Sequence, residues 1–277
     1  MKFSDNIFYR KMYFSFPLNE GPLLREVYVV LLKGSKNILI DSGVSYNHAD
    51  ILQLVKEADL KISDIDIVLL THCHGDHSGG LYRLKQENSE IKIWSHPLTK
   101  YVLEDIDAQF IRRPIPAYYE IIGGSVQVDH VLADGEIINI GYDIEIIYTP
   151  GHSDDSISFY IPTEKLLVSG DAIPYVHDIP IYEDLEKLKE SLKNLKVLSP
   201  EYVVSSFCGL WDRKTHGDIF AITEKHLQNI QNAVDEFRNV QPNGSLEDMG
   251  CFVMHEIDVL GVPPIPIFLA SIKDHIK

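Results

Sequence analysis

Apolar and polar positions in the first hundred residues follow a pattern that predicts an α/β fold. Residues 26–32 are apolar and rich in β-branched side chains, and residues 38–40 follow after a polar turn, so the two segments predict a β-hairpin. Apolar residues recur at helical spacing between 47 and 60, and the apolar run at 65–70 predicts a buried strand. A helix, a strand and a second helix are expected between residue 80 and the segment that begins at Pro97.

The rest of the chain predicts mostly sheet and then mostly helix. Amphipathic helices are expected at 183–195 and 218–238, with short helices at 245–277. With 277 residues, the chain is long enough for one α/β domain with a short appendage. Short segments rich in β-branched residues predict further strands at 126–131, 143–148, 156–161, 165–169 and 202–204.

The charge balance argues against nucleic acid as a partner. The chain carries 25 Lys and Arg against 41 Asp and Glu, a formal net charge of -16 at pH 7. A phosphate backbone that approaches such a protein meets net repulsion unless a local basic patch offsets it, and the sequence contains no dense run of basic residues. We therefore expect no nucleic-acid partner.

The N-terminal residues and the cysteines predict a cytoplasmic location. The first six residues lack the apolar segment of a secretory signal, and no apolar run reaches the ~18 residues that a membrane helix requires. Cys73, Cys208 and Cys251 are odd in number and widely spaced, which favours reduced thiols over a disulfide framework. We therefore expect a cytoplasmic protein with no membrane partner.

Three histidines and an aspartate crowd together directly after the strand predicted at 65–70. His72 and His74 lie two residues apart and point the same way on an extended backbone, whereas Asp76 and His77 can turn toward a second position. Such a density of ligand groups indicates a metal cation rather than a polar turn.

Two further strand ends carry ligand groups. His152 follows the strand predicted at 143–148, in the segment Thr-Pro-Gly-His, and Asp171 follows the strand predicted at 165–169, in the segment Ser-Gly-Asp. A sheet builds a site where several strand ends converge, so we expect His152 and Asp171 to join the first cluster.

The order and spacing of these motifs resemble the metallo-β-lactamase superfamily, and most closely its glyoxalase II and lactonase-type hydrolases. The resemblance covers about residues 20 to 210 and implies an α/β fold, a four-layer αββα sandwich, with a catalytic domain at 1–222 and a helical extension at 223–277 packed on it. It also implies two zinc ions per chain, with iron or manganese as alternatives. The implied ligands are His72, His74 and His152 for the first metal, Asp76 and His77 for the second, and Asp171 as the bridge between both.

The sequence departs from the family's pattern at one expected ligand of the second metal. The family usually supplies a final His after the last core strand, where residues 205–209 of this chain are Ser-Ser-Phe-Cys-Gly. Three replacements stay open: Cys208 as a thiolate, His216 from the following loop, or a water molecule.

Ligands of these types favour hydrolysis of a small-molecule substrate. A water held by the cations would lose a proton near neutral pH and attack a polarised carbonyl or phosphoryl group. Asp76 is the candidate to orient that water and accept its proton. Tyr175 is the candidate donor to the developing oxyanion, although it fits equally well as a packing residue beside Pro174. Esters, thioesters, lactones and phosphodiesters all remain open as substrates.

Other activities and partners stay open as alternatives. A mononuclear iron enzyme similar to persulfide dioxygenases is one, because the final His is missing, and a nuclease is disfavoured by the charge. Residues 105–125 form a long connection that could serve as a lid, in which Arg112 and Arg113 either meet an anionic group or are solvated. Residues 223–277 either cap the site or form a subunit contact in a homodimer.

Overall fold

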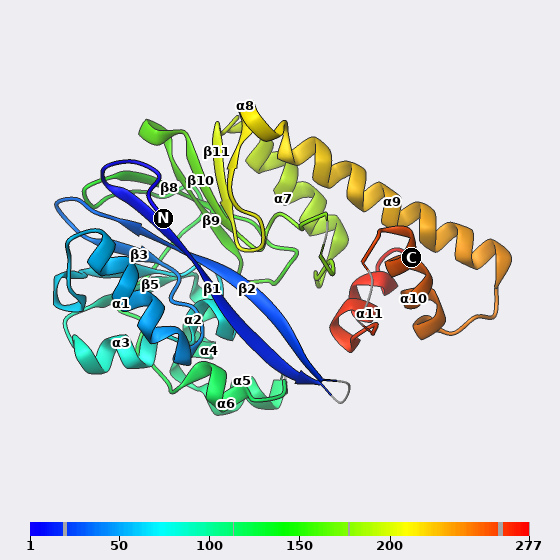
Figure 1. Cartoon of the computed structure of the whole chain (residues 1–277), viewed down its shortest axis with the longest axis horizontal. Helices are drawn as coiled ribbons and strands as arrows, with labels where there is room; N and C mark the ends of the chain where they lie inside the picture. The colour runs from blue at the N-terminus through cyan, green and yellow to red at the C-terminus, as the bar shows by residue number, and fades with distance from the viewer. Residues whose placement is uncertain (19–20, 113, 177, 260–262, 277) are drawn as a thin grey trace.

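Two β-sheets lie face to face, and helices cover the outer side of each (Figure 1). The computed structural model describes residues 1–18, 21–112, 114–176, 178–259 and 263–276. Within them the layers follow the order helix, sheet, sheet, helix, so the predicted four-layer αββα sandwich is confirmed.

The first sheet comes from the N-terminal half of the chain. Its six strands have the order β1-β2-β3-β4-β5-β6 in the described residues. The strands from β3 to β6 are parallel, so their carboxyl ends lie at the same edge. The strands are β1 (Ile7–Leu18), β2 (Gly21–Leu32), β3 (Ile38–Ile40), β4 (Ile67–Leu69), β5 (Lys92–Ser95) and β6 (His130–Val131).

The second sheet comes from the middle of the chain. Its six described strands have the order β12-β11-β10-β9-β8-β7, and only β10 and β11 pair in parallel. The strands are β7 (Ile137–Asn139), β8 (Asp143–Tyr148), β9 (Ile157–Ile161), β10 (Leu166–Gly170), β11 (Tyr202–Ser205) and β12 (Gly209–Asp212).

The helices divide between the two outer layers. Apolar residues of α1, α3, α4 and α6 cluster against the first sheet, and those of α7, α9, α10 and α11 cluster against the second. The helices are α1 (His48–Glu57), α2 (Gly75–Ser78), α3 (Leu81–Glu87), α4 (Pro97–Glu104), α5 (Ile106–Arg112), α6 (Tyr118–Ile122), α7 (Leu185–Val197), α8 (Arg213–His216), α9 (Ile219–Val240), α10 (Leu246–Glu256) and α11 (Pro266–Lys273).

A third apolar cluster fills the space between the sheets. It joins residues such as Ile40 and Leu69 of the first sheet to Ile146 and Val168 of the second, all of them buried. Burial of one such side chain is worth about 1.5–3 kcal/mol, so this shared core fixes the two sheets relative to each other. The loops at the edges of the two sheets are therefore held at fixed positions relative to each other.

The strand β1 was not among the predicted elements. Arg10 and Lys11 are adjacent charged residues in the middle of the strand, and they break the alternation of apolar and polar positions by which a strand is predicted. In the structure, ion pairs with Asp50 and Glu26 compensate these charges, and β1 pairs with β2 along its whole length. The result is a long hairpin that runs past the end of the sheet (Figure 1).

Other predicted elements agree in place and differ mostly in extent. The hairpin at 26–32 and 38–40 and the strand at 65–70 are confirmed as β2, β3 and β4. The strand expected at 126–131 is limited to β6, and residues 105–125 contain the short helices α5 and α6 rather than an irregular loop. The short edge strands β7 and β12 were not predicted, since three or four residues carry little periodicity.

The C-terminal helices pack on the second sheet beside α7. The helix α9 runs across the predicted boundary between residues 222 and 223, and that boundary stays a prediction. The helices α10 and α11 fold back beside α9 (Figure 1). Within the described residues, none of the helices combines the length and the apolar content needed to cross a membrane. The cytoplasmic location stays a prediction.

Candidate metal centre

In the segment after β4, the backbone changes from extended to helical between the first and the second pair of candidate ligands. His74 is extended and precedes the short helix α2, whose first turn carries Asp76 and His77. Gly75 is required between them, because a Cβ there would lie 2.5 Å from a side-chain carbon of Ile121. The turn brings both pairs of ligands to the same edge of the sandwich, which agrees with the sequence prediction.

Three imidazole nitrogens converge in the first half of the site. Nδ1 of His74 lies 3.0 Å from Nε2 of His72 and 2.9 Å from Nε2 of His152. In a tetrahedral zinc site with bonds of about 2.0–2.1 Å, ligand nitrogens lie roughly 3.3 Å apart. The spacing of the three rings therefore suits one cation bound by all three.

Asp171 joins this group to a second one. Its Oδ2 lies 3.2 Å from Nε2 of His152, and its Oδ1 lies 3.1 Å from Nε2 of His77. Oδ2 of Asp76 lies 3.7 Å from the same nitrogen of His77. A carboxylate that faces both groups has the position expected of a bridging ligand.

The buried polar atoms of the second group support a cation there. Nε2 of His77 and Oδ1 of Asp171 are buried, and neither has a hydrogen-bond partner of suitable geometry among the described residues. An unsatisfied buried polar atom costs free energy, and a cation between these atoms would remove that cost. Imidazole nitrogens and carboxylate oxygens are ligands that zinc accepts, so the residues fit the metals that the sequence implies.

Asp41 supports the ligand loop from behind, and sequence analysis did not identify it. One of its oxygens lies 2.8 Å from Nδ1 of His77, and the carboxylate accepts hydrogen bonds from the backbone N–H and the hydroxyl of Thr71. This contact places the proton of His77 on Nδ1 and leaves Nε2 free to bind a metal. Its position directly after the buried strand β3 was the available signal.

Asp155 is a second supporting carboxylate that sequence analysis missed. It accepts hydrogen bonds from the backbone N–H of Cys73 at 2.8 Å and from the hydroxyl of Thr99 at 2.7 Å. Its other oxygen accepts the hydroxyl of Ser153, the residue after His152. Asp155 therefore ties the two histidine-bearing loops to each other.

The charged groups of the site shift one another's pKa values. Burial disfavours the charged form of His77, but Asp171 and Asp41 outweigh it and raise the pKa of His77 well above its usual value. Burial also opposes ionisation of Asp171, yet His77 and His152 lower the pKa of Asp171 well below its usual value. Burial raises the pKa of Asp76. A cation on Nε2 of His77 would displace the proton that these carboxylates favour.

The structure places Cys208 and Tyr175 away from the six main ligands. Both line a small separate cavity with Trp211, and Cys208 belongs to neither of the two clusters of His, Cys, Asp and Glu found in the described part of the chain. Burial raises the pKa of the Cys208 thiol to about 11, which disfavours the thiolate that binds metals. The exposed His216 packs against Trp211. The geometry supports neither Cys208 nor His216 as the missing ligand.

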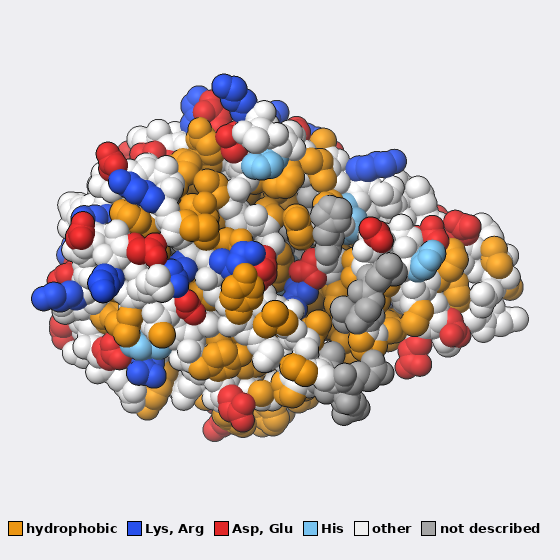
Figure 2. Space-filling model, viewed as in Figure 1, with side chains coloured by type: hydrophobic (Ala, Val, Ile, Leu, Met, Phe, Trp, Pro, Cys, Tyr) orange, Lys and Arg blue, Asp and Glu red, His pale blue; other side chains and the backbone are white. Residues whose placement is uncertain are grey.

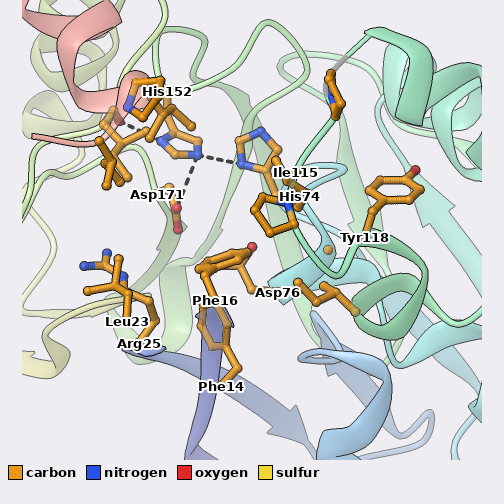
Figure 3. A pocket seen from close by; sticks show the side chains of 18 of the residues that line it. Phe14, Phe16, Leu23, Arg25, His74, Asp76, Ile115, Tyr118, His152 and Asp171 are labelled. Carbon is orange, nitrogen blue, oxygen red and sulfur yellow. Dashed lines mark hydrogen bonds and ion pairs between the residues drawn. The ribbon is translucent and has the colours of Figure 1, made fainter. Parts of the chain in front are cut away.

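A cavity of about 520 Å³ opens onto the metal centre (Figure 3). His74, Gly75, Asp76, His152 and Asp171 lie at its base, and Phe207 contributes to its wall. The remaining lining residues come from the β1–β2 hairpin (Phe14, Phe16, Leu23 and Arg25), from the segment between α5 and α6 and its flanks (Gln109, Pro114, Ile115, Pro116, Tyr118 and Ile121), from the loop before α7 (Ile181), and from the start of α11 (Ile265, Pro266 and Ile267).

The predicted lid and C-terminal cap can be compared with this lining. Residues 105–125 do border the cavity, whereas the side chains of Arg112 and Arg113 lie outside what the structure describes. The C-terminal segment borders it through residues 265–267. Of the two roles left open for 223–277, the structure supports the cap, and the homodimer contact stays a prediction.

Fold and site together define a class: a helix-covered sandwich of two sheets with a histidine and aspartate metal centre at one edge. The profile of the metallo-beta-lactamase superfamily matches residues 21–206, so the chain belongs to that superfamily. A metallo-beta-lactamase family protein of Thermus thermophilus has the same fold, with a TM-score of 0.69 over 96% of this chain and 91% of that one, at 18% identity.

Several curated relatives of this chain are named as thioesterases or related hydrolases. It is 29% identical over 207 residues to atrochrysone carboxyl ACP thioesterase of Aspergillus fumigatus, which covers 74% of this chain and 54% of that protein. It is 30% identical over 131 residues to hydroxyacylglutathione hydrolase GloC of Haemophilus influenzae, covering 44% and 55%. This chain spans about half the length of the first of these relatives.

Replacement of Asp41 by Asn tests its support of His77. The amide would offer an N–H to Nδ1 of His77, which favours the tautomer with its proton on the metal-facing nitrogen. We expect zinc affinity at the second site to fall about 10–100-fold, measured by competition with a chromophoric chelator. The matched control is Asp129→Asn, whose carboxylate accepts the backbone N–H of Ile93 on the same sheet. Equal affinity in both variants would contradict the assigned role.

Replacement of Cys208 by Ala tests whether the thiol binds metal. Because Cys208 lies in the separate cavity, we expect the variant to bind as many zinc ions as the unchanged protein, with the same affinities. Elemental analysis and the chelator titration measure both quantities. Selective loss of the second ion would instead restore Cys208 as a ligand.

Proposed function

We propose that this chain is a metal-dependent hydrolase that cleaves a carboxylic thioester or ester. The observation that carries the proposal is the convergence of six candidate ligand residues beside an apolar cavity. His72 belongs both to a group with His74 and His152 and to a group with His77 and Asp171. Asp76 lies 3.7 Å from His77. When bound, two zinc ions would polarise the substrate carbonyl and activate a water molecule. The names of the relatives support the thioester and ester classes.

The protein's own residues would orient the reactants. His72, His74 and His152 would hold the first metal, and Asp76, His77 and the bridging Asp171 would hold the second. Asp76 borders the cavity and keeps 15% of its side chain exposed, so its carboxylate is placed to accept a proton from the attacking water. Because Cys208 lines a separate cavity and His216 packs against Trp211, we propose that water completes the coordination of the second metal.

The same geometry bears on the alternatives. A mononuclear iron dioxygenase would need only one group of ligands, whereas Asp76 and His77 add a second group beside Asp171.

A phosphodiester substrate would call for cationic residues around the cavity. Among the described lining residues, Arg25 is the one Lys or Arg, and it already pairs with Asp178. The proposal therefore favours carbonyl substrates.

Metal removal and the substitution Asp76→Asn test the proposal together. We expect dipicolinate to abolish hydrolysis of simple thioesters and aryl esters, and added zinc to restore it. Asp76→Asn should lower kcat at least about 100-fold, within the range that a positioned proton acceptor contributes, and the first metal should stay bound. Asp154→Asn, an exposed carboxylate, is the control. A single iron ion with no hydrolysis would refute the proposal in favour of the dioxygenase.

A further inference from the structure

One face of the β1–β2 hairpin forms an apolar wall of the cavity. Phe16 lies directly opposite Leu23, and Phe14 lies directly opposite Arg25, so all four side chains are on the same face of the hairpin. All four line the cavity (Figure 3). Leu24 points to the other face and is 66% exposed.

Two further walls are also apolar. The segment between α5 and α6 contributes Ile115 and its two flanking prolines, and the start of α11 contributes Ile265 and Ile267. Apolar side chains are also exposed over the middle of the face that Figure 2 shows. The cavity is thus enclosed by apolar groups from three distant parts of the sequence, with the metal ligands at its base.

Tyr118 and Arg25, two polar residues of these walls, already have partners in the protein. The hydroxyl of Tyr118 donates to the carbonyl oxygen of Ile106 at 2.8 Å and also contacts the amide oxygen of Gln109. The guanidinium of Arg25 pairs with Asp178 and lies 5.0 Å from the ring centre of Phe207. A ligand held by these walls gains from burial of apolar surface more than from new hydrogen bonds.

We propose that the cavity binds a bulky apolar acyl group, with the scissile carbonyl at the metal ligands. This inference rests on the proposed thioester or ester hydrolysis and adds the substrate class. The volume of about 520 Å³ lies within the range of pockets that enclose most of a drug-sized ligand.

A series of acyl thioesters that differ only in chain length tests this inference. With N-acetylcysteamine thioesters from acetyl to decanoyl, kcat/KM should rise by up to about fourfold per methylene until the cavity is filled. Leu23→Asp should lower kcat/KM for the decanoyl thioester at least tenfold and leave the acetyl thioester within about twofold. Leu24→Asp, on the opposite face of the strand, should change neither value. Ile267→Asp, on another wall, should likewise lower kcat/KM for the decanoyl thioester and leave the value for the acetyl thioester nearly unchanged.

Binding of decanoate to the zinc-loaded protein separates this inference from the proposed function. Hydrolysis that does not depend on chain length would overturn the apolar acyl group and leave the hydrolase in place. If neither the thioesters nor the aryl esters are hydrolysed, the proposed function fails. Decanoate binding that Leu23→Asp weakens and Leu24→Asp preserves would still support the acyl site, and the absence of decanoate binding would overturn it.

A different set of contacts links α11 to the metal ligand His152. Nδ1 of His152 lies 2.8 Å from the carbonyl oxygen of Ile181, to which it donates when Nε2 faces the metal. The next residue, Tyr182, donates its backbone N–H to the hydroxyl of Ser271 at 2.9 Å. That hydroxyl lies 2.8 Å from the carbonyl oxygen of Tyr182. Ser271 lies in α11 and is fully buried.

The segment at 181–185 is held from both sides. On one side, the backbone N–H groups of Glu183 and Asp184 donate to the carbonyl oxygen of Gly151, the residue before His152. On the other side, the carboxylate of Asp274 in the C-terminal segment accepts the backbone N–H of Leu185 at 3.0 Å. The segment therefore connects the C-terminal residues to the loop that carries the ligand.

We infer that Ser271 is a positioning residue that orients His152 through Tyr182 and Ile181. When zinc is added to the metal-free protein, Ser271→Ala should lower the affinity of the first site about tenfold. Residues that orient a metal ligand typically change metal affinity about 10–100-fold, so the expected loss is at the low end of that range. Ser245→Ala removes the cap of α10 and destabilises the same helical region without contact to His152. It should leave zinc affinity unchanged. If both variants bind zinc as the unchanged protein does, or both lose affinity equally, the positioning role is refuted.

Discussion

The buried carboxylate of Asp41 is the contact on which the metal centre depends. It accepts the backbone N–H and the hydroxyl of Thr71, where β4 ends, and it holds the ring of His77 six residues further on. These contacts define both ends of the loop that carries His72 and His74. The buried charge of Asp41 is itself stabilised by these hydrogen bonds, so the loop and the carboxylate depend on each other.

Much of the site could be predicted from sequence because its ligands are local in the chain. His72, His74, Asp76 and His77 follow one strand, and His152 and Asp171 each follow another, so alternation and strand ends place them without knowledge of the whole fold. Asp41 also follows a strand, but a strand end alone does not show which residues a carboxylate supports. Asp41 contacts residues that follow the neighbouring strand β4, and Asp155, which follows β8 of the second sheet, accepts the backbone N–H of Cys73. Both roles depend on contacts between segments that are distant in the sequence.

The walls of the cavity escaped prediction for a related reason. Periodicity identifies a helix or a strand but does not say which of its faces meets a distant segment. The hairpin of β1 and β2, the segment after α5 and the start of α11 become neighbours only through tertiary packing. The strand β1 was hidden further by Arg10 and Lys11, whose partners lie in α1 and β2.

The segment after β11 bears both on the ligands available to a metal and on the apolar wall of the cavity. Where the family usually places a histidine ligand, this chain has Phe207 on the cavity wall and Cys208 in a separate apolar cavity. In the proposed hydrolase, the ring of Phe207 would add apolar surface for a substrate and would supply no ligand to a second metal. A second metal held by Asp76, His77 and Asp171 alone would have fewer protein ligands and more positions for water. Phe207 would thus extend the wall that we propose selects an apolar acyl group, at the position where the family's usual pattern has a metal ligand.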